Sequence, residues 1–319
     1  MTWLTTFALA LAQMLFIVAV APLVTGLIQK LKARLQARRG ASIWQPYRDL
    51  TKLFRKRAVQ SDSTSSFFVA VPVLVLGATL AAAALIPALW ALANDGSGPA
   101  LPLGDAILLL GLLALARFLT AIGALDAGGA FGGMGASREM TIAPLVEPVL
   151  MLVVFSVMVV AGTSDVADIA LRRASLDGLE LRAPDLIALA AVLVILIAET
   201  GRIPVDNPDT HLELTMLHEA MLLEHSGPAL GCLLLATHVK QLVVMCLVAA
   251  LFFPMGIATT LAPAALAVAL AAFAAKVLVL SAFLGLVESS YAKLRFFRVP
   301  QFLATGFVCA FVALALRLL

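Results

Sequence analysis

The chain has 319 residues, of which 62% are hydrophobic and 13% are charged, and its formal net charge is +3. A soluble domain is roughly half apolar and about a quarter charged, so this composition excludes an ordinary soluble protein and indicates lipid as the surrounding solvent. The small positive net charge does not indicate nucleic-acid binding. Ten of the 22 lysine and arginine residues lie between Lys30 and Arg57, next to an apolar stretch, where basic residues set membrane topology.

Eight apolar stretches can cross, or nearly cross, a hydrocarbon layer about 30 Å thick. The first is too long for a signal-peptide core, so we expect it to be retained as a helix. Because lipid-exposed backbone must be hydrogen-bonded within each span, we predict an all-α polytopic membrane protein, one integral domain over residues 1–319. The predicted spans are Leu4–Ile28, Phe67–Ala93, Asp105–Leu125, Thr141–Gly162, Pro184–Glu199, Ala229–Phe253, Leu261–Val287 and Gln301–Leu318.

The distribution of basic residues predicts the orientation. Eight spans place both termini on one side of the membrane. The first, third, fifth and seventh connections hold 15 of the 22 lysine and arginine residues. Because basic connections remain in the cytoplasm, we expect both termini on the periplasmic side of a bacterial or archaeal cytoplasmic membrane.

The first cytoplasmic connection, residues 30–66, is basic and contains a predicted amphipathic helix. From Ile43 to Arg57, apolar residues recur at helical spacing and basic residues occupy the other side. Such a helix suits the headgroup plane of the membrane, where each basic residue gains about 1 kcal/mol from anionic lipid. A docking face for a soluble partner is equally consistent with the pattern, and the two interpretations are compatible.

The glycine-rich connection between the third and fourth spans does not indicate a phosphate site. Five glycines between Gly128 and Gly135 predict a flexible or tightly turned backbone, but no Walker lysine follows them. The three cysteines stand singly in apolar segments at spacings that fit no zinc, haem or iron–sulfur site. We therefore expect no cofactor and no metal in this chain.

The fifth connection, residues 199–228, is acidic and contains three of the four histidines. Asn207 and Pro208 predict the start of a helix that ends at Gly227. In that helix His211, His218 and His225 would share one stripe, but heptad spacing places their rings about 10 Å apart. A metal ion cannot bridge that distance, so we interpret the stripe as a polar face toward water or a partner subunit.

Charged residues inside or beside the spans are candidates for a proton path. A charge at the bilayer centre costs at least about 2.5–3.5 kcal/mol, so each should face a partner or a hydrated cavity. Two interpretations remain open: static ion pairs, or a chain of protonatable groups that leads from a cytoplasmic cavity into the membrane. The candidate path residues are Arg117, Glu139, Glu147, Glu199, Asp206, Glu213, Glu219, Glu224, Lys240 and Lys276.

Four segments resemble the subunit-1 (NuoH-like) family of respiratory complex I. They are RRGASIWQPYRDLTKLFRK, ARFLTAIGALDAGGAFGGMGASREM, AETGRIPVDNPDTHLELTMLHEAMLLEHSG and ESSYAKLRFFRVPQFL. Within the family they are similar to the branch of membrane-bound hydrogenases, the hydrogenase-4 component C and formate hydrogenlyase anchors. The resemblance covers nearly the whole chain and implies a non-redox membrane subunit of an oxidoreductase complex, not catalytic alone.

The resemblance implies partners and site residues. The partners would be nickel–iron hydrogenase large and small subunits, ferredoxin-like iron–sulfur subunits and antiporter-like membrane subunits, with the nickel–iron centre and the iron–sulfur clusters in those partners. Glu199, Arg202, Pro204 and Asp206 match the family motif Ala-Glu-x-x-Arg-x-Pro-x-Asp. Candidate interface or cavity residues are Arg38, Arg39, Gly40, Arg48, Asp49, Lys52, Arg138, Arg202, Pro204 and His218.

Departures from the family pattern bear on quinone binding. Ala41 replaces a proline after Arg39-Gly40, and His225 stands where tyrosine is usual. The interval between Glu213 and Glu224 is also longer than in quinone-using relatives, whereas the acidic series is intact. The leading hypothesis is therefore an anchor that couples hydrogenase electron transfer to proton or sodium movement. The alternatives are a purely structural anchor and a quinone-site subunit, and the absence of visible repeats argues against an independent transporter.

Overall fold

The computed structural model describes residues 3–61, 64–91, 104–175, 182–206 and 216–319, and within them the regular elements are helices without a strand. The all-α polytopic fold predicted from the sequence is confirmed. The helices are α1 (Trp3–Leu35), α2 (Gln45–Arg55), α3 (Ser66–Leu85), α4 (Ala106–Asp126), α5 (Ala130–Ala161), α6 (Val166–Ser175), α7 (Ala183–Glu199), η1 (Glu219–Leu222), α8 (Gly227–Phe252), α9 (Pro263–Ser290), η2 (Phe296–Arg298) and α10 (Val299–Leu318).

Seven of the described helices are long and apolar enough to cross a membrane, where eight spans were expected. They are α1, α3, α4, α5, α8, α9 and the helix that includes α10. The remaining expected span is α7, which has only 17 residues. It ends at Glu199 because Gly201, with φ of +58°, and Pro204 follow and do not continue a helix.

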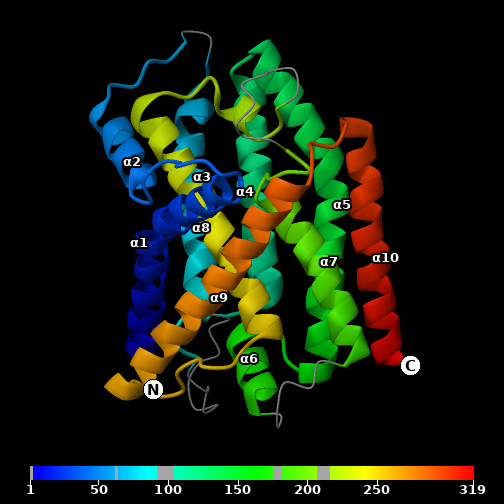
Figure 1. The fold of residues 1–319 in the computed structure, drawn as a ribbon. Coiled ribbons are helices and arrows are strands. Elements are labelled where there is room, and N and C mark those ends of the chain that lie inside the picture. Colours follow the sequence, from blue (N-terminus) through cyan, green and yellow to red (C-terminus); the bar gives the residue numbers. More distant parts are fainter. Residues whose placement is uncertain (1–2, 62–63, 92–103, 176–181, 207–215) are drawn as a thin grey trace.

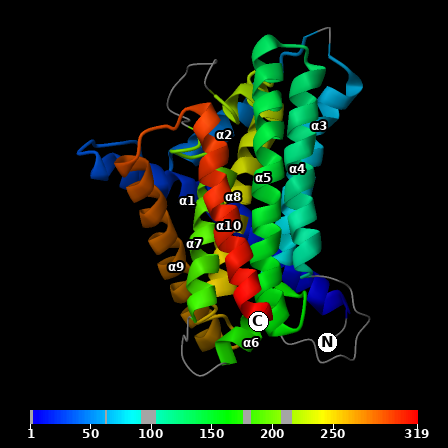
Figure 2. The same cartoon turned by 90° about the vertical axis from the view of Figure 1, so that its right-hand side faces the viewer.

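The helices form a bundle with most axes along one direction (Figures 1 and 2). Helix α9 runs obliquely across the bundle in front of α8, from the end that holds the N-terminus to the end that holds α2 (Figure 1). The N- and C-terminal ends lie at the same end of the bundle, together with α6 (Figure 1). The shared side expected for the two termini agrees with this arrangement, whereas the membrane side that this end faces stays a prediction.

Two local expectations are wrong. The glycine-rich segment is not mainly a turn, because α5 begins at Ala130 and includes Gly132, Gly133 and Gly135. The fourth span therefore starts eleven residues before Thr141, and of the five glycines in this segment only Gly128, with φ of +67°, has a backbone conformation that favours glycine.

The helix expected between Asn207 and Gly227 is also absent over the part that the structure describes. Residues 207–215, with His211 and Glu213, lie outside the described residues. From residue 216 to 226 the only regular element is the one-turn helix η1. Tertiary contacts override the helical periodicity here, because Leu217 and His218 donate their backbone N–H groups to Asp206 instead.

Helix α2 lies in the basic first connection, within the predicted range Ile43–Arg57. Pro46 and Leu50 are its buried residues. The Tyr47 hydroxyl donates a hydrogen bond to the Ala19 carbonyl of α1, which ties α2 to the bundle. Burial raises the pKa of this hydroxyl, and the loop before α2 packs so closely on α1 that a Cβ on Gly26 would lie 2.1 Å from the Ile43 carbonyl oxygen.

Candidate functional site

Arg117 of α4 is the centre of a buried ionic cluster. Its Nε lies 3.2 Å from Glu139 Oε1 and its Nη1 lies 3.4 Å from Glu147 Oε1, both on α5. Its Nη2 contacts Glu199 Oε1 at the end of α7. The planar guanidinium presents five donors, so one arginine can engage three carboxylates on two other helices. The structure thus brings together four of the candidate path residues.

Lys240 of α8 completes the cluster. Its Nζ lies 2.8 Å from Glu199 Oε2, so the two oxygens of Glu199 face two different cations. We call Arg117, Glu139, Glu147, Glu199 and Lys240 the Arg117 cluster. Three carboxylates and two cations leave one net negative charge when all five groups are ionised. Glu147 differs from the other acids, because its side chain is 40% exposed whereas those of Glu139 and Glu199 are 3% and 2% exposed.

The chain after α7 is irregular and buried. Residues 201–206 are all buried, and Glu199 at the start of this turn pairs with Lys240, which lies 13 residues into α8, or about 20 Å along that helix. Irregular backbone at membrane depth is tolerated where protein buries it or where it lines a wet cavity. The motif that carries Arg202, Pro204 and Asp206 therefore forms a buried turn in the bundle.

A line of polar side chains joins the Arg117 cluster to this turn. His218 Nε2 lies 3.7 Å from Glu139 Oε1, and His218 Nδ1 lies 3.9 Å from Asp206 Oδ2. Asp206 Oδ1 in turn accepts from Lys293 Nζ at 3.0 Å. The two histidine distances are longer than hydrogen bonds, and they suit an intervening water molecule or a small side-chain movement.

A second buried ionic cluster was missed by the reasoning from sequence. Arg202 Nη1 donates to Glu288 Oε1 of α9 at 2.9 Å, and its Nη2 donates to Gln241 Oε1 of α8 at 2.8 Å. Lys32 Nζ of α1 lies 3.2 Å from Glu288 Oε2. The signal was present, because Glu288 directly follows the uncharged residues 277–287, but the expected span ended at Val287 and the acid was counted as part of the next connection.

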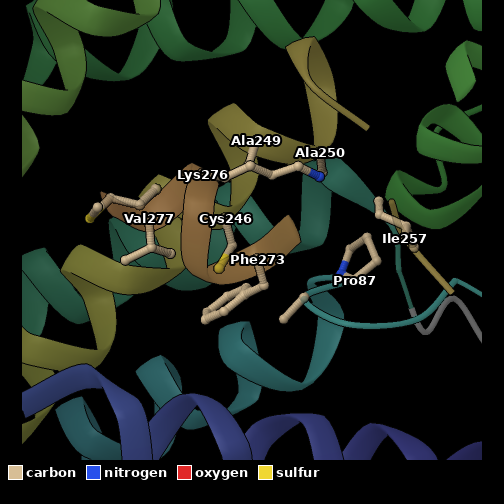
Figure 3. A pocket seen from close by; sticks show the side chains of 10 residues that line it. Pro87, Cys246, Ala249, Ala250, Ile257, Phe273, Lys276 and Val277 are labelled. Atoms are coloured by element: carbon tan, nitrogen blue, oxygen red, sulfur yellow. The ribbon is translucent and has the colours of Figure 1, made fainter. Parts of the chain in front are cut away.

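The remaining path candidates lie apart from the Arg117 cluster. Glu219 begins η1, and Glu224 is exposed beside the start of α5, where a Cβ on Gly129 would lie 2.0 Å from Glu224 Oε1. Lys276 lies in the middle of α9 against α8 and is not joined to these charges by a contact of 4 Å or less among the described residues (Figure 3). Their inclusion in a path stays a prediction, as does that of Glu213.

The interface candidates separate into an exposed group and a buried group. Arg138 is half-buried and donates to the Met216 carbonyl oxygen at 3.2 Å, so it holds the segment before η1 rather than facing solvent. Arg202 and Pro204 belong to the buried turn. The exposed candidates, all in or before α2, are Arg38, Arg39, Gly40, Arg48, Asp49 and Lys52.

His225, expected on the stripe with His218, lies in a different environment. Its ring stacks on Phe68 of α3 with centroids 4.1 Å apart and planes 4° apart. Burial lowers its pKa to about 4, so the ring is neutral at physiological pH. The adjacent Ser226 Oγ exchanges two 2.7 Å hydrogen bonds with the backbone of Val59, which ties the segment after α2 to the start of α8.

No group of three or more histidine, cysteine, aspartate or glutamate side chains is placed to hold a metal ion in the described part of the chain. The charged groups of the described site have proton-transfer and ion-pair chemistry of their own. They can hold a proton on a carboxylate, pass it to a neighbour, or fix the helices against one another.

One family model and two relatives match this chain over nearly its full length. A family model described as NADH dehydrogenase matches residues 7–318. Hydrogenase-4 component C of Escherichia coli is 34% identical over 304 residues, which are 95% of this chain and 93% of that protein. Formate hydrogenlyase subunit 4 of the same organism is 35% identical over 304 residues, 95% of this chain and 96% of that protein.

Two more distant proteins also match much of the chain. One subunit of the NADH-quinone oxidoreductase of Anaplasma phagocytophilum is 29% identical over 240 residues, 70% of this chain and 69% of that protein. A chain in the solved structure of the membrane-bound sulfane sulfur reductase, an archaeal respiratory membrane complex, superposes with a TM-score of 0.79. The match covers 97% of this chain and 99% of the other at 23% identity, which shows a shared fold.

Proposed function

Since this chain belongs to the NADH dehydrogenase family, we propose that it is the membrane-anchor and ion-coupling subunit of an energy-converting nickel–iron hydrogenase complex. The two Escherichia coli relatives, a hydrogenase-4 component and a formate hydrogenlyase subunit, support the hydrogenase branch over the quinone branch. The partners are then hydrogenase large and small subunits, ferredoxin-like subunits and antiporter-like membrane subunits. The nickel–iron centre and the iron–sulfur clusters belong to those partners.

The observation that carries the ion-coupling role is the charge balance of the Arg117 cluster. Its three carboxylates and two cations leave one negative charge in a site that lipid and protein surround. An uncompensated charge at that depth is costly, so uptake of one proton by the cluster is favourable. A site that alternates between the net charges −1 and 0 can accept a proton from one side and release it to the other.

Groups that can pass a proton to the Arg117 cluster, or take one from it, lie on both sides of the cluster. The line from Asp206 through His218 to Glu139 supports proton entry from the side of the turn that follows α7. The side chain of Glu147 supports exit toward a neighbouring membrane subunit, because 40% of it stays exposed on a spanning helix although Arg117 pairs with one of its oxygens. The exposed residues in and before α2 would then dock the hydrophilic arm on the cytoplasmic side.

A purely structural anchor is the second candidate, and one observation favours it. Arg117 contacts every acid of the cluster, and Lys240 takes the second oxygen of Glu199. Buried ion pairs of this kind can fix four helices without carrying a proton. The two candidates differ in whether Glu147, the exposed member, can lose its charge without loss of ion movement.

The deciding experiment is Glu147→Gln in the assembled complex, reconstituted in vesicles. Hydrogen evolution and the proton or sodium movement coupled to it are measured together. The ion-coupling role predicts that hydrogen evolution continues while coupled ion movement falls at least several-fold. Asp126→Asn is the matched control, because Asp126 ends α4 as an acid that accepts from Ser65 outside the cluster. Full ion movement in Glu147→Gln, equal to that of the control, would leave only the structural anchor.

A further inference from the structure

Lys276 is a charged residue at the middle of a spanning helix. It lies 13 residues after Pro263 and 14 residues before Ser290, the two ends of α9, and the helix is otherwise uncharged up to Glu288. A lysine costs up to about 2.5–3.5 kcal/mol on insertion scales, the full value at the bilayer centre, and this side chain lies level with the ends of α3 and α8. That cost requires a compensating group near the ammonium.

The side chain enters a pocket between α9 and α8 (Figure 3). The pocket holds about 10 Å³, roughly the space that the centre of one water molecule occupies. That space admits a single polar atom, such as one carboxylate oxygen. Apart from Lys276, the lining has one polar side chain, the thiol of Cys246, and no carboxylate; it includes Pro87, Cys246, Ala249, Ala250, Ile257 and Phe273.

Lys276 differs from the cations of the Arg117 cluster. Arg117 and Lys240 each have a carboxylate of this chain within 4 Å, and among the described residues no carboxylate oxygen lies that close to Lys276. The C-terminal end of α8, at Phe252, is near the pocket, and its helix dipole can offset about 1 kcal/mol of the cost. A deficit remains that an anionic group would remove.

The position of Lys276 on α9 shows from where such a group can come. At 100° per residue, Lys276 lies at the border between a buried strip that includes Phe273 and Val277 and an exposed strip that includes Val268 and Val279. Val268 and Val279 are 61% and 67% exposed. A helix packed on the exposed strip would reach Lys276 from the side.

We propose that Lys276 forms an intramembrane ion pair with a carboxylate on a transmembrane helix of a neighbouring subunit, which packs against α9. The occupant is an aspartate or glutamate side chain, by charge complementarity with the Lys276 ammonium, and one of its oxygens enters the pocket. This interface lies on a different helix from the Arg117 cluster. It goes beyond the proposed function, because a purely structural anchor would use the same contact.

Dicyclohexylcarbodiimide applied to the complex in native membranes tests the pair directly. This membrane-permeable reagent activates a buried carboxyl group, and an adjacent lysine amine then displaces the urea to form an amide. Mass spectrometry of the digested complex should find Lys276 joined to an acidic peptide of another membrane chain. A link to an acid of this same chain, or a Lys276 amine that stays unmodified, would overturn the proposal.

Substitutions give an independent result. Lys276→Met removes the charge and keeps the length, so the isolated chain should be as thermally stable as the wild type or more so. Co-purification of the neighbouring membrane subunit through a tag on this chain should fall at least several-fold, and Lys276→Arg should restore it. Unchanged co-purification in Lys276→Met would contradict the pair. Coupled ion movement in Glu147→Gln tests the proposed function separately, so failure of one proposal is distinguishable from failure of the other.

Discussion

Arg117 and Glu199 lie 82 residues apart in sequence, yet the guanidinium of one donates to the carboxylate of the other in the interior of the bundle. The contact joins the middle of α4 to the last residue of α7. Helix α7 ends at this contact, and Gly201, with φ of +58°, and Pro204, which cannot continue a helix, follow it. The helix-stopping residues thus place the last side chain of α7 beside Arg117 and Lys240.

Removal of Arg117 should destabilise the protein more than neutralisation of its partner Glu199. Arg117→Met leaves three buried or half-buried carboxylates with Lys240 alone, whereas Glu199→Gln leaves two acids and two cations. Loss of one member of a buried ion pair costs about 3–5 kcal/mol. We expect Arg117→Met to reach that range and Glu199→Gln to fall well below it, as measured by unfolding of the purified protein in detergent.

The double variant Arg117→Met with Glu199→Gln supplies the control for this difference. Because the remaining charge excess is smaller than in Arg117→Met alone, the double variant should be the more stable of the two. A double variant that is less stable than Arg117→Met would show that the arginine acts through packing rather than through charge.

Two glycines of α5 that are two residues apart should respond differently to alanine. A Cβ on Gly135 would lie 2.8 Å from the Ala220 Cβ and 3.1 Å from the Leu217 carbonyl oxygen, so Gly135→Ala pushes η1 away. A Cβ on Gly133 meets nothing within 4 Å. Gly133→Ala should therefore stabilise the helix by up to about 1 kcal/mol, and Gly135→Ala should destabilise the protein by about 1–3 kcal/mol.

Thermal unfolding of the two glycine variants measures these effects. Since η1 follows His218, hydrogen exchange of residues 216–222 should also rise in Gly135→Ala and stay unchanged in Gly133→Ala. Equal exchange in the two variants would mean that the contact between α5 and η1 does not hold this segment in place.

The spans could be predicted from the sequence because their signal is local. Apolar length alone locates α1, α3 and α8, and helical periodicity locates α2 within a few residues. The segment before α8 was predicted wrongly for the opposite reason. Its pattern is that of a helix, but the backbone N–H groups of Leu217 and His218 bind Asp206. A contact with a residue in another turn leaves no periodic trace in the sequence.

For the candidate site, the sequence identified individual charged residues but not their arrangement in space. The cost of a charge in lipid identified Arg117, Glu147 and Lys240 without knowledge of the fold. Their arrangement around one guanidinium could not be derived, because it depends on which helices are neighbours. Glu288 was overlooked, since its position at the end of α9 made it resemble a loop residue until Arg202 and Lys32 were seen on either side of it.

Ser226 should hold the segment after α2 in place. Its Oγ accepts from the Val59 N–H and donates to the Val59 carbonyl oxygen, each at 2.7 Å. Ser226→Ala removes both bonds at a partly exposed position, so we expect a loss of about 1 kcal/mol and faster proteolysis between residues 56 and 61. Ser137→Ala is the matched control, because the Ser137 hydroxyl bonds only within α5, to the Met134 carbonyl oxygen. Identical proteolysis of the two variants would show that other contacts hold the segment.

His225 should make the stability of the protein depend on pH in the acidic range. Burial against Phe68 lowers the pKa of His225 to about 4 in the folded state, whereas the ordinary value, expected in the unfolded chain, is 6.5. Above pH 6.5 the ring is neutral in both states and contributes no pH dependence. As the pH falls from 6.5 to 4, the unfolded state takes up a proton that the folded state does not, so stability is lost.

The slope from one such proton is at most about 1.4 kcal/mol per pH unit. His225→Phe keeps a flat ring against Phe68 and removes the titration, so its stability should fall less than that of the wild type between pH 7 and pH 4.5. The measurement is the unfolding midpoint of both proteins in detergent at each pH, and the difference between them cancels the contributions of the other titrating groups. Parallel pH profiles would mean that His225 does not resist protonation in the folded state. The stack on Phe68 would then accommodate an imidazolium.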